Sequence, residues 1–211
     1  MASSQQSHAP AVVVLAAGYL TGLIAYPNLP GPFLHATPSA RILVAFTLPT
    51  TALVVYALFR SLWTHDRVRS GNGAFQSTYR AIVLRALLFI VALHALVMIE
   101  LTDATDAIGL RLASSRIVIV MLGVVLVAIG NLLPRTRPNI AVGVRTTRTL
   151  ANAQLWQYVH RAGGYATVGL GIVIALTGLV LAHDVAGAVV AAAALCAVLT
   201  VFVSYRRHLR A

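Results

Sequence analysis

Apolar residues in this chain come in six long runs separated by short polar segments. The runs extend from about Pro10 to Tyr26, Arg41 to Trp63, Tyr79 to Leu101, Arg116 to Leu133, Gly164 to Ala182 and Val185 to Tyr205. A helix needs about 17 to 20 apolar residues to cross the hydrocarbon core of a bilayer. Lipid offers backbone groups no hydrogen-bond partner, and the runs are too uniformly apolar for alternating barrel strands. The pattern therefore predicts an all-α polytopic membrane protein with six transmembrane helices.

The polar segments divide the chain into three predicted parts. Residues 1–64 form an N-terminal two-helix membrane region, residues 65–78 a cytoplasmic connection, and residues 79–211 a four-helix membrane region. The first nine residues contain no Lys or Arg, so the basic n-region of a signal peptide is missing. We therefore expect the first apolar run to be retained as a membrane span.

The longest polar connection lies between the fourth and fifth runs. Pro134 and Pro138 stop the fourth helix, and Gly143 allows the chain to turn. Thr149 or Asn152 is expected to cap a short helix.

The sequence "ANAQLWQYVHRA", Ala151 to Ala162, has helical spacing. It predicts a short interfacial helix that leads through Gly163 and Gly164 into the fifth span, with Trp156 in the aromatic belt of the membrane interface.

Composition and charge support this membrane assignment. Hydrophobic residues make up 59% of the chain and charged residues only 10%, against roughly 25% charged residues in soluble domains. The net charge of +11 comes from sixteen arginines and no lysine. These arginines flank the apolar runs, which favours a role in membrane orientation over direct binding of nucleic acid.

The arginines also predict which ends of the helices face the cytoplasm. They are concentrated between runs two and three, between runs four and five, and in the C-terminal tail, whereas four of the five acidic residues lie between the other runs or at the ends that face them. With six spans these Arg-rich segments share one side of the membrane, and the positive-inside rule places that side in the cytoplasm. We expect a multi-pass protein of the cell membrane with both termini in the cytoplasm.

The segment Gly130 to Gly164 resembles the signature region of the SdpI family, bacterial integral membrane proteins related to an immunity protein against a sporulation-delaying peptide toxin. The family pattern runs G-N-x-x-P, then P-N-x-x-x-G-x-R-T-P-W-T-L, then W, then H-R-x-x-G. The chain matches it at Gly130, Asn131, Pro134, Pro138, Asn139, Gly143, Arg145, Thr146, Thr149, Leu150, Trp156, His160, Arg161 and Gly164. It departs at Thr147 and Arg148, where the family pattern has Pro and Trp.

A weaker resemblance concerns the N-terminal region. "YPNLPGPFLH", Tyr26 to His35, is similar to an element of a domain of unknown function often fused to this family, although the spacing is one residue short. His94 lies in the third span, where members of the family tend to carry a histidine.

The candidate site residues have both functional and structural interpretations. Arg145 suits an anion such as a lipid phosphate, a peptide carboxylate or an acidic side chain of a partner, but it also serves as an orientation charge. His94 is a functional candidate because a histidine inside a span is costly; the alternative is one interhelical hydrogen bond. The candidates in the cytoplasmic loop are Asn131, Asn139, Gly143, Arg145, Thr146, Thr149, Trp156 and His160.

Motifs of known enzymes are absent from the sequence, and we expect no enzymatic activity, no cofactor and no metal site. The resemblance implies immunity to a membrane-active peptide toxin, with the lipid bilayer and the toxin as partners. It also allows a signalling role, in which the Arg-rich loop recruits a cytoplasmic transcriptional repressor. A small transporter or lipid-handling protein is the alternative, with His94 in the pathway. The oligomeric state stays open.

Overall fold

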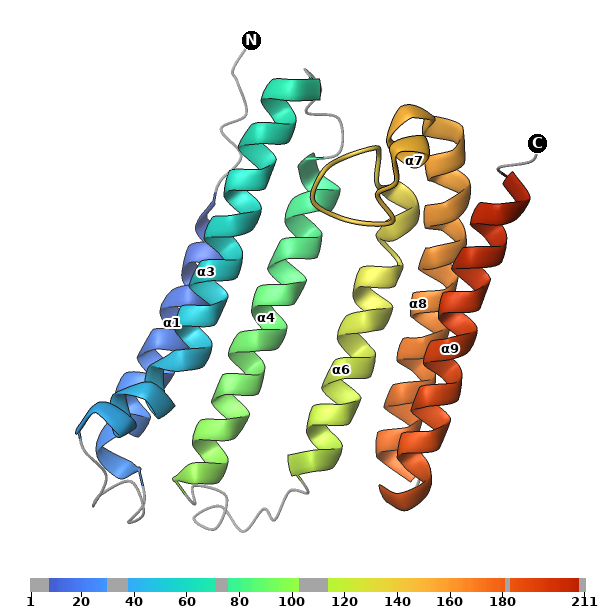
Figure 1. The fold of residues 1–211 in the computed structure, drawn as a ribbon. Coiled ribbons are helices and arrows are strands. Elements are labelled where there is room, and N and C mark those ends of the chain that lie inside the picture. Colours follow the sequence, from blue (N-terminus) through green and yellow to red (C-terminus); the bar gives the residue numbers. More distant parts are fainter. Residues whose placement is uncertain (1–7, 30–37, 71–75, 103–113, 181–182, 209–211) are drawn as a thin grey trace. The chain divides into compact units, whose positions relative to one another are not determined.

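The computed structural model describes residues 8–29, 38–70, 76–102, 114–180 and 183–208. The described residues form seven α-helices and two short 3-10 turns, with no strand among them (Figure 1). The elements in chain order are α1 (Ala9–Ala25), η1 (Tyr26–Asn28), α3 (Pro38–Ser70), α4 (Gln76–Leu101), α6 (Ser114–Gly130), η2 (Leu133–Arg135), α7 (Thr147–Ala151), α8 (Ala153–Val180) and α9 (His183–His208).

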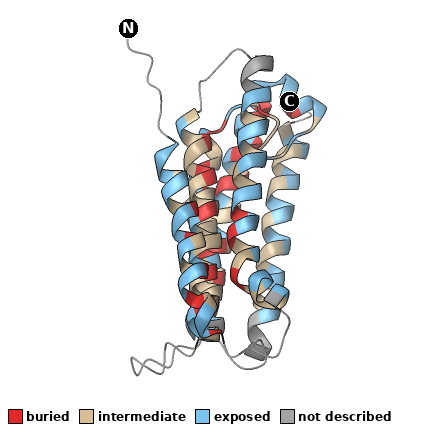
Figure 2. Ribbon diagram, turned by 90° about the vertical axis from the view of Figure 1, so that its left-hand side faces the viewer, coloured by how far each residue is buried: buried red, intermediate tan, exposed pale blue. Residues whose placement is uncertain are grey.

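Six of these helices are long and apolar enough to cross a membrane, which confirms the predicted all-α polytopic fold. Large apolar side chains remain exposed along them, for example Val180 at 74% and Val198 at 65%. Figure 2 shows exposed residues along most of the length of the helices. Such surfaces are stable when lipid covers them.

Around the predicted cytoplasmic connection the helix ends differ from the predicted ones. α3 continues to Ser70, seven residues beyond Trp63, and α4 begins at Gln76. The cytoplasmic connection predicted for residues 65–78 is therefore helical at both ends, and its middle, residues 71–75, lies outside the described residues. His35 also lies outside them.

The chain divides into two compact units, and the first comprises Met1–Leu58 and Ala86–Ser114. In this unit α1 buries Leu15, Gly18, Gly22 and Ala25. Gly18 and Gly22 form a G-x-x-x-G motif, which allows close approach of a neighbouring helix. A Cβ atom on Gly22 would lie 2.4 Å from the Ala45 carbonyl oxygen of α3. Only glycine therefore fits at this crossing.

Pro49 explains why that carbonyl is available. α3 runs through Pro49, which has no N–H to donate to the carbonyl four residues earlier, that of Ala45. Because Gly22 has no side chain, the backbone of α1 can come up to this carbonyl. Ala45 is fully buried and belongs to a core with Ala25, Leu29 and Met98.

The second unit comprises Phe59–Arg85 and Ser115–Ala211. Here α6 and α8 meet along glycines spaced seven residues apart. A Cβ on Gly123 would lie 2.5 Å from the Gly171 carbonyl oxygen, and one on Gly171 would lie 2.6 Å from the Gly123 carbonyl oxygen. Gly178 and Gly164 make similar approaches to α6 and to Pro134 just beyond it. Gly171 and Gly178 are thus used for packing within this chain.

α9 lies alongside α8 in the same unit (Figure 1). Hydroxyl groups inside the spans are satisfied locally, since threonines donate to the carbonyl four residues earlier. Examples are Thr177 to Val173 (2.7 Å) and Thr200 to Cys196 (2.8 Å). This bonding lets polar side chains lie in apolar helices without a partner from another element.

Candidate functional site

The loop between α6 and α8 is folded around the side chain of Asn139, which is 2% exposed. Its Oδ1 accepts hydrogen bonds from the backbone N–H groups of Ala141 (2.9 Å) and Val142 (2.8 Å). Its Nδ2 donates to the carbonyls of Arg137 (2.7 Å) and Val142 (3.2 Å). The amide group therefore uses both acceptor and both donor positions on the loop backbone. A side chain with these functions fixes the shape of the turn.

Gly143 packs directly against His160 of α8. Its φ angle is +110°, a conformation that other residues rarely adopt. A Cβ atom at this position would lie 1.8 Å from Nε2 of His160. The backbone N–H of the next residue, Val144, donates to the same Nε2 at 3.0 Å. Glycine is required here both by the backbone conformation and by the imidazole.

The hydrogen bonds of His160 define its protonation state. Its Nδ1 lies 2.8 Å from the Trp156 carbonyl, which can only accept, so Nδ1 carries the proton. Its Nε2 accepts from Val144 and so carries none. A neutral imidazole that is 2% exposed thus joins α8 to the loop. An imidazolium has no acceptor and could not make the bond to Val144.

Trp156 supports His160 from one turn earlier on α8. The two rings are stacked, with centroids 3.8 Å apart and planes 13° from parallel. The indole N–H donates to the Thr136 hydroxyl at 3.2 Å, and Trp156 is 0% exposed. The expected place of Trp156 in the interfacial aromatic belt is therefore wrong, because the folded loop covers it completely.

The far end of the loop is closed by α7. The Thr146 hydroxyl accepts from the Thr149 N–H (3.1 Å), and the Thr149 hydroxyl accepts from the Thr146 N–H (2.9 Å), which forms a capping box. The Thr149 hydroxyl also donates to the Val144 carbonyl at 2.8 Å. Tyr205 of α9 donates to the Thr146 hydroxyl at 3.4 Å. α9 is therefore linked to the same network.

The outer surface of the loop is cationic. The guanidinium of Arg145 donates to the Ile140 carbonyl within the loop, but the side chain remains exposed. No Asp or Glu occurs in the sequence from residue 107 to 183. The exposed arginines on and beside the loop are Arg135, Arg137, Arg145, Arg148 and Arg161. The hydrogen-bonded loop thus exposes guanidinium groups, and residues 107–183 contain no acidic side chain to neutralise them.

A known protein family matches the part of the chain that contains this loop and the helices after it. Residues 135–205 match the SdpI/YfhL protein family. Over these residues the chain is therefore similar to the SdpI/YfhL family. The match spans the loop, α7, α8 and most of α9, and includes none of α1, α3, α4 and α6. Neither a curated protein nor a solved structure was found to match the chain.

The SdpI/YfhL region brings most of the predicted site residues into one network. Asn139, Gly143, Thr146, Thr149, Trp156 and His160 are joined through backbone and side-chain contacts. Arg145 lies on the outside of that network. Asn131 stands apart, since its side chain is exposed and its backbone N–H donates to the Val127 carbonyl in the last turn of α6.

The predicted interfacial helix over Ala151 to Ala162 is not a separate element. α8 begins at Ala153 and continues without interruption through Gly163 and Gly164. Asn152 does cap a helix, as predicted, because its Oδ1 accepts from the N–H groups of Gln154 and Leu155. The glycine pair does not break the helix because both glycines are buried in it, where Gly164 packs against Pro134.

Three residues of the network were not among the predicted candidates. Thr136 receives the indole N–H, Val144 contributes its backbone N–H and carbonyl, and Tyr205 reaches the cap from α9. Val144 acts only through its backbone, which side-chain identity does not reveal. Tyr205 lies 59 residues from Thr146 along the chain, so no local spacing could connect the two.

His94 lies in the other unit of the fold. It is 0% exposed within α4, and neither ring nitrogen has a hydrogen-bond partner among the described residues. The backbone of Gly18 on α1 lies near the ring. Among the described residues no hydrogen bond of ordinary geometry reaches the ring, and the Gly18 backbone is the group to which an interhelical bond would run. A buried polar group without a partner is unusual in a folded protein.

Proposed function

We infer that residues 135–205, which match the SdpI/YfhL family, belong to a membrane protein of the immunity type. We propose that this chain protects the cell that carries it against a membrane-active peptide toxin. It would act by binding rather than by catalysis, holding the toxin or its lipid target so that no pore forms.

The observation that carries this proposal is the hydrogen-bonded loop with its exposed arginines. Orientation in a membrane requires only positive charge, with no particular order of residues. Here Asn139, the His160–Trp156 stack and the capping box hold the loop in one shape. Ordering a loop costs conformational entropy. This cost is explained if Arg145 and Arg148 bind a partner in a defined geometry.

Carboxylate and phosphate are the groups that suit these arginines. A guanidinium binds either of them through two parallel hydrogen bonds. A toxin C-terminus, a lipid headgroup and an acidic surface of a regulator all supply such groups. If the loop faces the cytoplasm, as the distribution of arginines predicts, a transcriptional repressor is the partner that would carry the signal onward.

A second candidate function is transport or lipid handling. It is favoured by His94, whose unpaired imidazole is buried in a span. Ionisable groups in that position often mark a pathway for ions or substrates.

The direct test is survival of toxin-sensitive cells that express the chain. We expect protection by the parent protein and its loss in Arg145→Ala. Arg137→Ala is the matched control, because Arg137 is also exposed in the loop and its substitution removes the same charge. Equal sensitivity of cells with and without the parent protein, across several such toxins, would contradict the immunity role. Equal loss in both variants would show that total charge matters and the position of Arg145 does not.

A further inference from the structure

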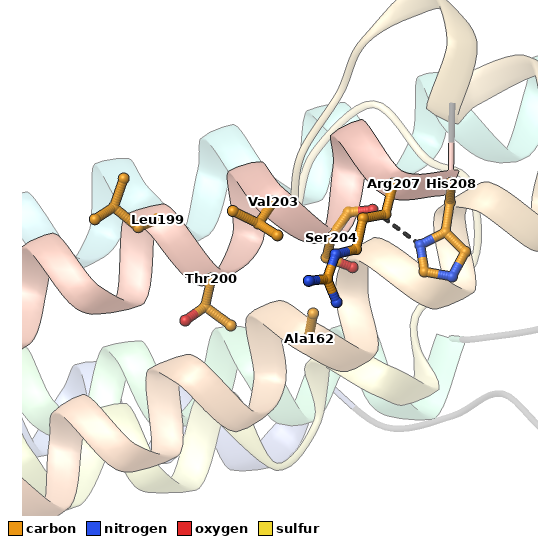
Figure 3. A pocket seen from close by; sticks show the side chains of 7 residues that line it. All are labelled: Ala162, Leu199, Thr200, Val203, Ser204, Arg207 and His208. Carbon is orange, nitrogen blue, oxygen red and sulfur yellow. Dashed lines mark hydrogen bonds between the residues drawn. The ribbon is translucent and has the colours of Figure 1, made fainter. Parts of the chain in front are cut away.

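A groove between α8 and α9 begins within the SdpI/YfhL match and extends beyond its end to Arg207 and His208, apart from the hydrogen-bonded loop. Figure 3 shows the residues that line it, one from α8 and six from α9. They are Ala162, Leu199, Thr200, Val203, Ser204, Arg207 and His208. Its volume of about 440 Å³ falls within the range of small-molecule sites.

The lining of the groove changes in character along α9. Leu199 and Val203 are exposed and apolar, and Ala162 faces the same space from α8. One to two turns further towards the C-terminus, Arg207 and His208 provide polar nitrogen atoms. His208 is held in place, because its ring stacks on Tyr158 with centroids 4.2 Å apart and its Nδ1 donates to the Ser204 carbonyl at 2.9 Å.

Arg207 has no anionic partner in the part of the chain that the structure describes. The sequence contains no Asp or Glu after Asp184, and none between residues 107 and 183. The neighbouring Arg206 is directed differently, with its guanidinium 6.0 Å from the centre of the Phe202 ring. Only one of these two adjacent cations therefore lines the groove.

We infer that this groove binds one molecule of an anionic glycerophospholipid. An acyl chain lies along Leu199 and Val203, and the phosphate is bound by Arg207 beside His208. The end of a membrane-spanning helix is where apolar and headgroup regions of a bilayer meet, and basic pockets between such helices bind anionic headgroups. An acidic peptide could also pair with Arg207. It would not, however, fill the apolar part of the groove, which lies at the depth of the acyl chains.

The single cysteine of the chain allows a direct measurement. Cys196 is exposed one turn before Thr200 on the same face of α9, about 16 Å along the helix from Arg207. A fluorophore attached there would report brominated acyl chains that enter the groove. The labelled full chain would be placed in phosphatidylcholine vesicles that contain a minority of brominated phosphatidylglycerol or brominated phosphatidylcholine.

We expect brominated phosphatidylglycerol to reach half-maximal quenching at a concentration about fivefold lower than brominated phosphatidylcholine. Arg207→Gln should abolish this preference, and Ala162→Phe should abolish it by filling the groove. Arg206→Gln is the matched control, because it removes the same charge one residue away and should keep the preference.

Three results would overturn the inference. They are equal quenching by both lipids in the parent protein, equal loss of preference in the Arg206 and Arg207 variants, and a preference that survives Ala162→Phe. Fluorescence that neither brominated lipid quenches would overturn it too. The vesicles contain no toxin, so the outcome is independent of the proposed immunity role.

Discussion

At the scale of single residues, Gly143 and His160 show how one contact specifies a loop that composition describes only as polar. The His160 imidazole occupies the space that a side chain at position 143 would need. The Val144 N–H donates a hydrogen bond to its Nε2. The two residues are 17 positions apart, yet a side chain at position 143 would collide with the His160 ring. Both residues therefore contribute to the fold of the loop that carries Arg145.

Gly143→Ala should open this loop. The new methyl group would collide with His160, and a non-glycine residue at positive φ costs about 1–3 kcal/mol. We expect trypsin to cleave after Arg145 about tenfold faster or more than in the parent protein.

Gly169→Ala is the matched control for this experiment. Gly169 lies in α8, and nothing lies within 4 Å of the added methyl group. Trypsin should therefore cleave this variant after Arg145 at the same rate as the parent protein. Resistance of Gly143→Ala to trypsin equal to that of the parent would mean that the loop does not depend on the glycine.

His94→Leu should raise the thermal stability of the protein. An unpaired buried polar group costs about 1–3 kcal/mol, and leucine of similar size removes that cost. The midpoint of thermal unfolding in detergent would be compared with that of Met98→Leu, a buried control one turn further along α4 that should change little. A lower midpoint in His94→Leu would show that the ring does have a partner in the native protein.

At the scale of elements, α7 explains how this chain keeps the family loop without the usual Pro-Trp pair. Thr147 is the first residue of α7, where proline is favoured because its N–H would have no helical partner. Thr146 has φ −104° and ψ 160°, which suits a residue before proline. The cap formed by Thr146 and Thr149 persists here without either family residue.

Thr147→Pro should therefore stabilise the loop by about 0.4–1 kcal/mol, since it restricts the unfolded chain without disturbing the cap. Slower tryptic cleavage after Arg145 would be the measurement. Leu150→Pro is the control, and it should be cleaved faster than the parent protein. The Leu150 side chain is exposed, so its replacement matters little, but the hydrogen bond from the Leu150 N–H to the Thr146 carbonyl (3.0 Å) is lost. Faster cleavage in both variants would show that α7 differs from the capped helix described above.

At the scale of the whole molecule, the six apolar helices follow from the bilayer as a solvent, and the arginines indicate their direction. The chain is a multi-pass membrane protein. The cytoplasmic location of both termini and of the loop remains a prediction from the positive-inside rule.

A thiol placed on the loop would test this topology. Thr147→Cys in a Cys196→Ala background exposes one cysteine at the start of α7. We expect a membrane-impermeant maleimide to label it only after the cells are lysed. Gly187→Cys should be labelled in intact cells, because Gly187 lies near the start of α9, at the other end of that helix from Tyr205, which contacts the loop. The reverse pattern would place the arginine-rich loop outside and would remove the proposed encounter with a cytoplasmic repressor.

The sequence by itself determined the class of fold, because a span must satisfy its backbone within one helix and its length is set by the thickness of the bilayer. It also marked Asn139, Gly143 and His160 as members of one spaced pattern. Only the tertiary structure decided what these residues do. Their roles depend on contacts between the loop, α8 and α9, such as Thr136 with Trp156 and Tyr205 with Thr146. Burial of Trp156 and the continuity of α8 through its glycines depend on the same packing, which no local pattern of polarity encodes.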